Sequence, residues 1–392
     1  MPIGEDPEAR FGPPNGFKDK YRVIETEGYQ PERDIGEQAL KRFNLGSKKS
    51  YQYLRPLLRI PYRLYSEIFH YPDKEKRWKH PAIEAGERLL ENERVDAIIS
   101  SSSPVTCHII AKELKNKHKI PWVADLRDLW TQNHNYPYSF LRRMIERRLE
   151  LATSKYADAL VVVSSPAAEQ LKKLHKREDV CVITNGFDPE RLNEKEMALT
   201  SKFTITYTGQ IYAGKQDPSK LLIALRNLID DGTVEPENVE VGFYGPLDGL
   251  LAREIEEYGL SLVVKQYGVV PRQVAYEKQR ESQLLLLLNW DDPKEKGVYT
   301  LKIFEYLASK RPILAMGGFG SDVIEALLKE TKAGVYCSMV EDIKSALRVF
   351  YLEYKNSGTV TYTGDTEKIN KYSYREMAKQ FVAVLDKSLS AK

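Results

Sequence analysis

The sequence predicts an α/β protein in which parallel sheets are covered by helices. From about Val95 onward, short β-branched runs alternate with amphipathic stretches that are long enough to be crossover helices. The chain has 392 residues, more than one ordinary domain, so two hydrophobic cores are expected. Its 42% hydrophobic and 29% charged residues are typical of a globular protein, and no apolar run approaches the ~18 residues of a membrane span.

Ten apolar runs are the expected strands, in two series that each fit a Rossmann-like unit. The first series comprises residues 95–101, 120–126, 158–164 and 179–185. The second comprises residues 203–209, 239–245, 262–268, 282–289, 311–317 and 333–338. Between them, Asn185-Gly186 and Pro189 indicate a turn, so we place the domain boundary there. The expected domains are residues 1–187 and 188–370.

The chain is different at its two ends. No clear buried strand precedes Val95, with the exception of a candidate at 21–27, and no glycine-rich turn follows such a strand. We therefore expect residues 1–70 to be irregular and the N-terminal domain to be incomplete, as in a truncated chain. At the other end, Ser373 and Glu376 form a capping box that predicts a terminal amphipathic helix within 371–392.

The segment 297–315 is the strongest candidate for a binding site, because a turn leads there into a helix that ends before a buried strand. The backbone N–H groups around Thr300 and Leu301 would face an anion at the positive end of the helix dipole. Lys302 adds a mobile cation, and Glu305 follows on the same face, where its carboxylate could accept both hydroxyls of a ribose. The segment predicts a nucleotide-diphosphate site; the alternative is an ordinary Glu–Lys pair on a helix surface.

A second anion site is predicted at residues 207–225, where a strand ends in Gly209 and a short loop carries Gly214 and Lys215 before a helix. Gly209 permits a close backbone approach, and Lys215 could reach a phosphate. The alternative is a βα loop with a solvated lysine.

A third cluster, Asp125, Arg127 and Asp128, follows the expected strand 120–126. The carboxyl edge of a doubly wound sheet is where ligands bind, so these charges predict a polar acceptor pocket with catalytic residues. The alternative is an Arg–Asp pair that ties the strand to a neighbouring loop.

Other chemistry finds little support in the sequence. Cys107, Cys181 and Cys337 lie far apart, the histidines lack metal-ligand spacing, and His108 is expected to be packed on a helix. We therefore predict neither a metal nor a cofactor. The net charge of +3 gives no reason to expect nucleic-acid binding, and the N-terminus lacks a readable secretory signal, which favours the cytoplasm.

Two stretches, 51–69 and 138–152, interleave arginines with bulky apolar or aromatic residues. This composition is typical of interfacial helices that approach anionic lipid, so a peripheral contact with the inner face of the membrane is one interpretation. Ordinary surface helices with snorkelling arginines are the other.

Six motifs follow one another along residues 70–392: VDAIISSSSP, IPWVADLRDLW, DALVVVSSPAAEQL, VITNGFDPERL, YTGQIYAGK and GVYTLKIFEYLASKRPILA. In this order they resemble GT-B fold retaining glycosyltransferases, in particular glycosyltransferase family 4. The resemblance implies two Rossmann-like domains whose parallel sheets face a cleft, with the C-terminal helix returning to the first domain. It makes Glu305 the ribose-binding glutamate, Lys215 the phosphate-binding lysine, and Thr300 and Leu301 the amides on the diphosphate.

The chain departs from the family pattern at three positions. Gly297 stands where the family commonly has a first glutamate, Gln210 where it has an arginine, and Arg127 where many members have a histidine. Gly245 and Val269 complete the residues that we expect to line the donor.

The function implied by the resemblance is a retaining, metal-independent transfer of a hexosyl or N-acetylhexosaminyl group. The donor would be a UDP- or GDP-sugar, and the acceptor a glycan or lipid-linked molecule in cell-surface polysaccharide biosynthesis. Two alternatives stay open: a non-catalytic nucleotide-sugar-binding remnant or scaffold, motivated by Gly297 and the missing first strand, and a sugar-nucleotide epimerase of the same architecture.

Overall fold

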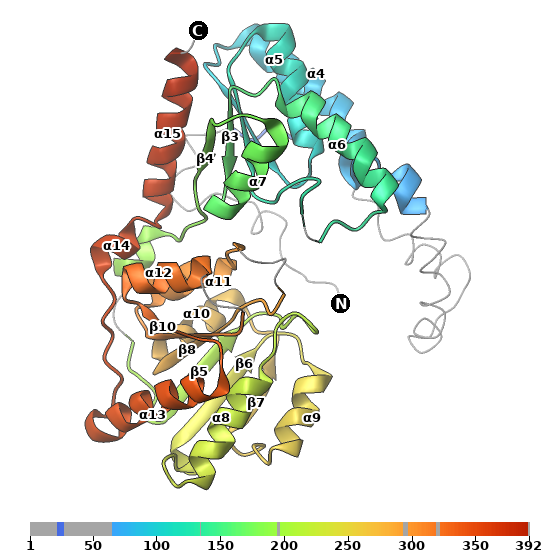
Figure 1. Ribbon diagram of the computed structural model, residues 1–392. Coiled ribbons are helices and arrows are strands. Elements are labelled where there is room, and N and C mark those ends of the chain that lie inside the picture. Colours follow the sequence, from blue (N-terminus) through green and yellow to red (C-terminus); the bar gives the residue numbers. More distant parts are fainter. Residues whose placement is uncertain are drawn as a thin grey trace. The chain divides into compact units, whose positions relative to one another are not determined.

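The computed structural model describes residues 22–26, 65–133, 135–193, 197–292, 297–318 and 322–390. Contacts divide the chain into two compact units, residues 1–122 with 138–156, and residues 123–137 with 157–392. The chain folds into two parallel sheets with helices between successive strands (Figure 1). The predicted α/β class is therefore confirmed.

The first sheet has four strands in the order β1-β2-β3-β4. Val123 pairs with Ala159 and Leu160 with Val180, both in parallel register, and every residue of β2 and β3 is buried. Burial on both faces explains why these strands appear in the sequence as continuous apolar runs. The strands are β1 (Ile98–Ser102), β2 (Trp122–Leu126), β3 (Ala159–Val162) and β4 (Val180–Val182).

Helical segments accompany these four strands. They are the 3₁₀ helices η1 (Lys74–Trp78) and η2 (Pro189–Asn193) and the helices α4 (Lys79–Asn92), α5 (Thr106–His118), α6 (Phe140–Ser154) and α7 (Ser165–His175). The candidate strand at 21–27 does not form, because residues 22–26 adopt no regular structure. Its other residues, and the rest of 1–64 with the expected irregular start, lie outside the described part of the chain.

The second sheet has six parallel strands in the order β10-β9-β8-β5-β6-β7. The chain moves outward in one direction from β5 and in the other from β8, so the topological switch point lies between β5 and β8. Ligands bind at the carboxyl ends of strands at such a point. The strands are β5 (Phe203–Thr208), β6 (Val239–Tyr244), β7 (Val264–Gly268), β8 (Leu284–Leu288), β9 (Ile313–Met316) and β10 (Gly334–Cys337).

Strand β8 shows how the five leucines of one run serve two cores. Leu284, Leu286 and Leu288 point into the core that includes buried residues of α8 and α13, whereas Leu285 and Leu287 point into the core of α11 and α12. The period of two along a strand produces this division. The helices are α8 (Ser219–Asp230), α9 (Gly249–Glu257), α10 (Arg272–Glu281), α11 (Leu301–Ser309), α12 (Val323–Thr331), α13 (Val340–Ser357) and α14 (Thr366–Asn370), with a 3₁₀ turn η3 (Pro236–Asn238).

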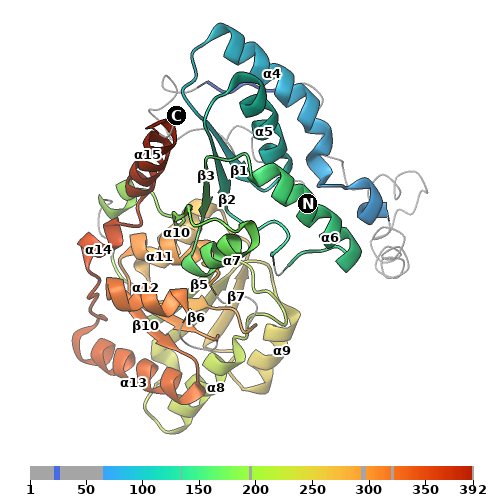
Figure 2. The same cartoon turned by 45° about the horizontal axis from the view of Figure 1, so that its top comes forward.

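The last helix, α15 (Tyr374–Ser390), lies beside β3 and β4 (Figures 1 and 2). The Ser373 hydroxyl accepts a hydrogen bond from the Glu376 N–H at 3.4 Å, as the capping box predicts. Residues Met377, Phe381, Val384 and Leu385 follow helical spacing and pack on a cluster that contains Val123, Ala159, Val161 and Ile183.

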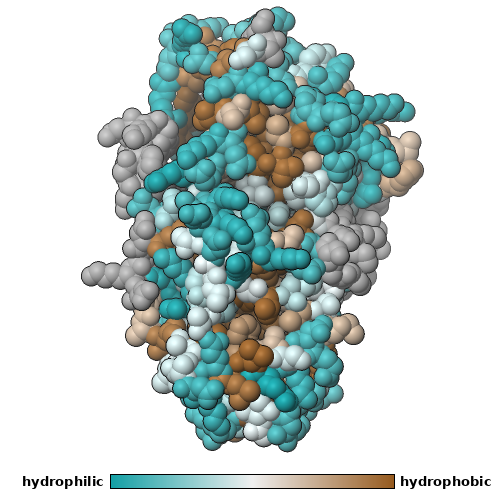
Figure 3. All heavy atoms as spheres, turned by 60° about the vertical axis from the view of Figure 1, so that its left-hand side comes forward, coloured by the Kyte–Doolittle hydropathy of each residue, from teal (hydrophilic) through white to brown (hydrophobic). Residues whose placement is uncertain are grey.

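The molecular surface is mostly hydrophilic on the face that Figure 3 shows, with smaller exposed hydrophobic areas between the polar side chains. Among the described residues, no helix combines the length and the apolarity that crossing a bilayer requires.

Candidate functional site

The start of α11 is an open helix N-terminus. Thr300 occupies the N-cap position with extended backbone angles, but its side chain does not cap the helix. Its Oγ1 is buried and has no hydrogen-bond partner among the described residues, although threonine is a good N-cap. The first amides of the helix, including that of Leu301, are thus left without a side-chain acceptor at the positive end of the dipole. This arrangement suits an external anion.

Lys302 extends from the first turn of α11 over the loop that follows β5. Its Nζ lies 5.2 Å from the centroid of the Tyr207 ring, and a methyl group on Gly209 would overlap its Cε. Burial lowers the pKa of Lys302, and the nearby Glu305 carboxylate partly opposes this shift. The aliphatic stem of Lys302 thus packs on an aromatic ring and a bare backbone.

Gly209 makes this packing possible, and Gly245 makes the next contact. Gly209 has a φ of +113°, a region that favours glycine, and its N–H donates to the Tyr244 carbonyl at 2.7 Å. A Cβ on Gly245 would overlap the Gly209 carbonyl oxygen. The loops after β5 and β6 therefore touch through backbone alone at this point.

Two other predicted donor residues follow strands of the same sheet. Gln210 comes after β5 and is exposed, and its carbonyl accepts a hydrogen bond from the Tyr207 hydroxyl at 2.7 Å. Val269 comes after β7 and is 77% exposed.

The Glu305 carboxylate is held by a pair of residues on α10. Its Oε1 accepts hydrogen bonds from the Tyr276 hydroxyl at 3.2 Å and from Arg272 at 3.5 Å. Burial is the main cause of the raised pKa of Tyr276, and the Glu305 charge adds to it. The Arg191 guanidinium stacks 3.6 Å from the centroid of the Tyr276 ring. The sequence analysis missed these partners, for which the only local signal is the i,i+4 spacing of Arg272 and Tyr276.

A buried polar network fixes α11 against β5 and α10. Gln279 donates to the Thr208 hydroxyl at 2.9 Å and accepts from the Ser309 hydroxyl at 3.0 Å. The Thr208 N–H donates to the Tyr306 hydroxyl at 3.1 Å. Because these groups are buried, breaking one contact would leave a desolvated partner, so the network holds the helix in a single position.

Lys215 lies in the loop between β5 and α8, where Gly214 has a φ of +73°. Its Nζ donates to the Asn135 side chain and lies 5.6 Å from the Trp290 ring centroid. The buried Gln216 shapes the loop, accepting from the Tyr212 N–H at 3.2 Å and donating to the Leu288 carbonyl at 2.8 Å. The sequence analysis did not foresee Asn135 as a partner for this lysine.

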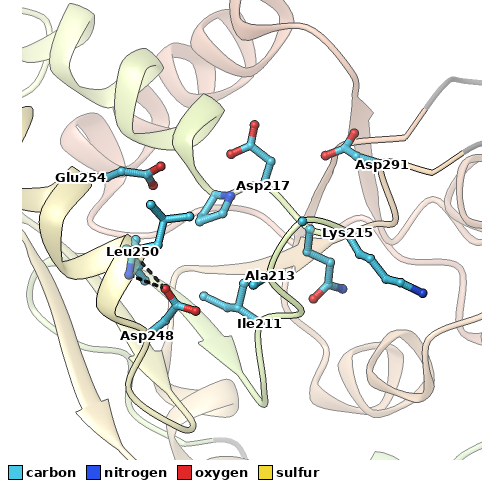
Figure 4. A pocket seen from close by; sticks show the side chains of 12 residues that line it. Ile211, Ala213, Lys215, Asp217, Asp248, Leu250, Glu254 and Asp291 are labelled. Carbon is cyan, nitrogen blue, oxygen red and sulfur yellow. Dashed lines mark hydrogen bonds between the residues drawn. The ribbon is translucent and has the colours of Figure 1, made fainter. Parts of the chain in front are cut away.

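A cavity of about 230 Å³ lies beside this loop (Figure 4). Asp217, Asp248, Glu254 and Asp291 contribute acidic groups to its lining, and the Lys215 side chain points away from Glu254 in Figure 4. Burial and the neighbouring carboxylates raise the pKa of Glu254. Lys215 also belongs to the lining, so the cavity presents one cation among four carboxylates.

Asp125 and Arg127 form a tie between strands. Asp125 Oδ2 accepts from Arg127 Nε at 2.8 Å, while the Arg127 guanidinium donates to the Ile183 carbonyl at 3.1 Å and to the Asn185 side chain at 3.3 Å. This is the structural alternative that the sequence left open for these two residues. Asp128, by contrast, is exposed.

Gly297 has a structural reason to be glycine. Its φ is +92°, and a Cβ there would lie 2.6 Å from the Cβ of Pro166. Its N–H donates to Asp322 at 3.3 Å, and Asp322 also accepts from the buried Asn289 at 2.7 Å. A glutamate at 297 would meet both strain and overlap.

His108 is packed, as the sequence predicted. Its Nδ1 lies 2.7 Å from the Ser100 hydroxyl, which also accepts from the Trp122 indole at 2.7 Å, and burial lowers the pKa of His108 to about 4. No group of histidine, cysteine, aspartate and glutamate side chains within the described ranges could hold a metal ion.

Comparisons with known proteins agree with this architecture. Residues 47–191 match the family model described as Glycosyltransferase Family 4. No curated protein matches the sequence.

Solved structures share the fold at low sequence identity. HepE of Anabaena, solved in complex with UDP, has a TM-score of 0.57 at 14% identity over 78% of this chain and 82% of its own. The UDP-forming trehalose-phosphate synthase of Burkholderia xenovorans has a TM-score of 0.56 at 12% identity, over 82% and 83%. WaaB, a lipopolysaccharide outer core galactosyltransferase, has a TM-score of 0.51 at 15% identity, over 79% and 80%. The chain thus has the GT-B fold of glycosyltransferases, and its segment 47–191 carries the sequence pattern of glycosyltransferase family 4.

Proposed function

We propose that the protein is a glycosyltransferase that moves a sugar from a nucleotide-diphosphate sugar to an acceptor hydroxyl, with retention at the anomeric carbon. The observation that carries this proposal is the open start of α11 at the switch-point edge of the six-stranded sheet. Thr300 leaves the helix N-terminus without a cap, and Lys302 lies one turn from Glu305 on the same helix. An anion and a polyol would find complementary groups here.

The roles follow from the chemistry of each group. The diphosphate binds the first amides of α11 and the Lys302 ammonium, whose stem packs over the bare backbone of Gly209. Glu305 accepts the hydroxyls of the ribose. As the bond between the anomeric carbon and the diphosphate oxygen breaks, negative charge grows on the leaving diphosphate, and the helix dipole with Lys302 stabilises it. We propose that this positive charge, joined by Lys215, serves in place of a metal ion.

The acceptor side is proposed at the carboxyl end of β2. Asp128 is exposed there and is the acid that could contact an incoming hydroxyl, while Asp125 and Arg127 act as positioning residues for the loop. The acceptor hydroxyl forms the new bond to the anomeric carbon, and its proton passes to the departing diphosphate oxygen. We further propose that the acceptor is a glycan or lipid-linked precursor of a cell-surface polysaccharide, met by the cytoplasmic protein at the inner face of the membrane, and that UDP- or GDP-sugars are the donors.

The test is calorimetric titration of UDP, GDP and ADP, with their sugars, into wild-type protein and Glu305→Ala. We expect one nucleotide family to bind, and its affinity to fall about tenfold or more in the variant, since a charge-assisted contact is lost. Glu277→Ala, a half-buried glutamate of α10, is the matched control and should bind as wild type. Equal affinities for wild type and Glu305→Ala would remove Glu305 from the site.

A second assay separates transfer from its alternatives. Wild-type protein is incubated with the bound sugar nucleotide, with and without extracted lipid-linked acceptors, and the products are separated by mass spectrometry and NMR. A new glycoside with the anomeric configuration of the donor supports the proposal. Nucleotide binding without any product indicates a binding remnant, and an epimerised donor formed without acceptor indicates an epimerase.

A further inference from the structure

Helix α6 has its polar stripe inside and its apolar stripe outside. Arg142, Glu146 and Glu150 lie on one face and are 4%, 1% and 0% exposed. On the opposite face Phe140 is 77% and Leu141 67% exposed. A surface helix of a globular protein normally shows the reverse polarity.

The buried face is inverted because Arg142 organises the segment that precedes η1. Its Nε donates to Glu146 at 2.5 Å, and its other nitrogens donate to the carbonyls of Glu67 and, at 2.6 Å, of His70. The Tyr138 ring lies 4.1 Å from the guanidinium carbon. Since this charge is paired and hydrogen-bonded on all sides, the inward orientation of the polar stripe is fixed, and the apolar stripe is forced outward.

The contacts between α6 and residues 66–70 also bring two exposed apolar residues near the start of α6. Glu67 accepts from the Ser139 N–H at 2.9 Å, immediately before α6 begins. The next two residues after it, Ile68 and Phe69, are 69% and 53% exposed. The structure thus joins 65–69, the described end of the predicted interfacial stretch 51–69, to the other stretch, 138–152; residues 51–64 lie outside the described part of the chain.

We call Phe140, Leu141, Met144, Ile145, Arg147 and Arg148 the α6 outer face. These positions fall on one side of a helix because their spacing follows three to four residues per turn. Both arginines are exposed, whereas both acidic residues of α6 are buried. The outer face is therefore apolar and basic, with no carboxylate of its own helix to neutralise it.

We propose that the α6 outer face, with Ile68 and Phe69, docks the protein on an anionic phospholipid surface. The charge distribution argues for this occupant, because apolar side chains enter the headgroup boundary while arginines at the same level meet lipid phosphates. A protein partner or a second copy would need a complementary acidic patch, which the outer face itself does not supply. The inference deepens the membrane location proposed above by assigning it to one helix face and one lipid chemistry.

The experiment is vesicle flotation of the full-length protein with phosphatidylcholine alone and with added phosphatidylglycerol, at low and high salt. We expect binding only with phosphatidylglycerol and weaker binding at high salt. Arg147→Gln with Arg148→Gln should lower the partition coefficient about thirtyfold. Leu141→Ser with Ile145→Ser should lower it about tenfold or more. The control, Val349→Ser with Leu352→Ser, changes exposed apolar residues of α13 and should bind as wild type.

Three results would overturn the proposal: no binding by wild type, equal binding to both vesicle types, or unchanged binding by the α6 variants. A change from dimer to monomer in Leu141→Ser with Ile145→Ser, seen by light scattering without vesicles, would instead assign the outer face to a second copy. Far-UV circular dichroism of the same variants shows that they are folded. Titration of UDP and GDP into the wild type separates the two proposals, because vesicle binding by a chain that binds no nucleotide would refute the donor site and leave the docking face standing.

Discussion

Replacing Lys302 with methionine separates the role of its charge from the role of its stem. The aliphatic stem packs over Gly209 and Tyr207, and methionine fills nearly the same space, so the packing should survive. The ammonium group, by contrast, forms no ion pair within the described part of the chain and is partly desolvated. The variant therefore loses about 1.5–3 kcal/mol of charge-assisted contact with the diphosphate, or about 10- to 150-fold in UDP affinity.

The free energy of unfolding should not fall in Lys302→Met, although the UDP affinity does. Burial lowers the pKa of Lys302, so the unfolded chain binds more protons than the folded one between the folded pKa and the ordinary value of 10.5. The free energy of unfolding of the wild type thus rises with pH across that window. Below the window Lys302 is protonated in the folded protein, and its buried charge is unfavourable. Lys302→Met should lack this rise and should be at least as stable as wild type at neutral pH.

The assay is UDP calorimetry combined with urea unfolding at several pH values. Lys329→Met, an exposed lysine of α12, is the matched control and should change neither quantity. If Lys302→Met keeps the UDP affinity of wild type, the diphosphate does not meet this ammonium. If it unfolds more easily at neutral pH, the reasoning about its burial is refuted instead.

Three further changes test the geometry around this lysine. Tyr276→Phe removes the hydroxyl that orients Glu305, so UDP affinity should fall about five- to tenfold, which is less than for Glu305→Ala. A larger loss of affinity than in Glu305→Ala would contradict a positioning role for Tyr276. Gly209→Ala places a methyl group against Lys302 at a residue with positive φ. We therefore expect the free energy of unfolding in urea to fall by about 1–2 kcal/mol and UDP binding to weaken. Wild-type values for both quantities would show that the loop has room for the methyl group. Arg127→Met breaks the link from Asp125 to the end of β4, so the free energy of unfolding should fall by about 3–5 kcal/mol. The UDP affinity of the protein that remains folded should stay at the wild-type value. Unchanged stability with weaker UDP binding would instead place Arg127 in contact with substrate.

The central strands β2, β3, β8 and β9 were predictable because a strand buried on both faces leaves a strong local signal. The run of leucines at 284–288 is such a case, and the start of α11 after Thr300 was also foreseen from its turn. Periodicity reports the neighbours of a residue in the sequence, however, and it does not report which distant side chains meet. The pairing of Glu305 with Tyr276, 29 positions earlier, is of this second kind.

The same limit explains the candidate residues whose surroundings differed from expectation. The sequence showed that Arg127 follows a strand, but its partners Ile183 and Asn185 are 56 and 58 positions away. The inverted polarity of α6 was equally hidden. A helix of alternating arginines and apolar residues has an amphipathic pattern whichever face is buried, and only the contacts of Arg142 decide between them.

The inverted helix also bears on how the protein can be handled and redesigned. Substituting leucines for Arg142, Glu146 and Glu150, a change that usually strengthens a loosely packed core, would here remove the anchors of residues 66–70. Polar replacements at Phe140, Leu141 and their neighbours would leave those anchors in place. They are therefore the better way to prepare the protein without detergent. Engineering of this helix should thus follow the solvent exposure of its side chains in the structure, since its hydropathy profile alone would direct the substitutions to the wrong side.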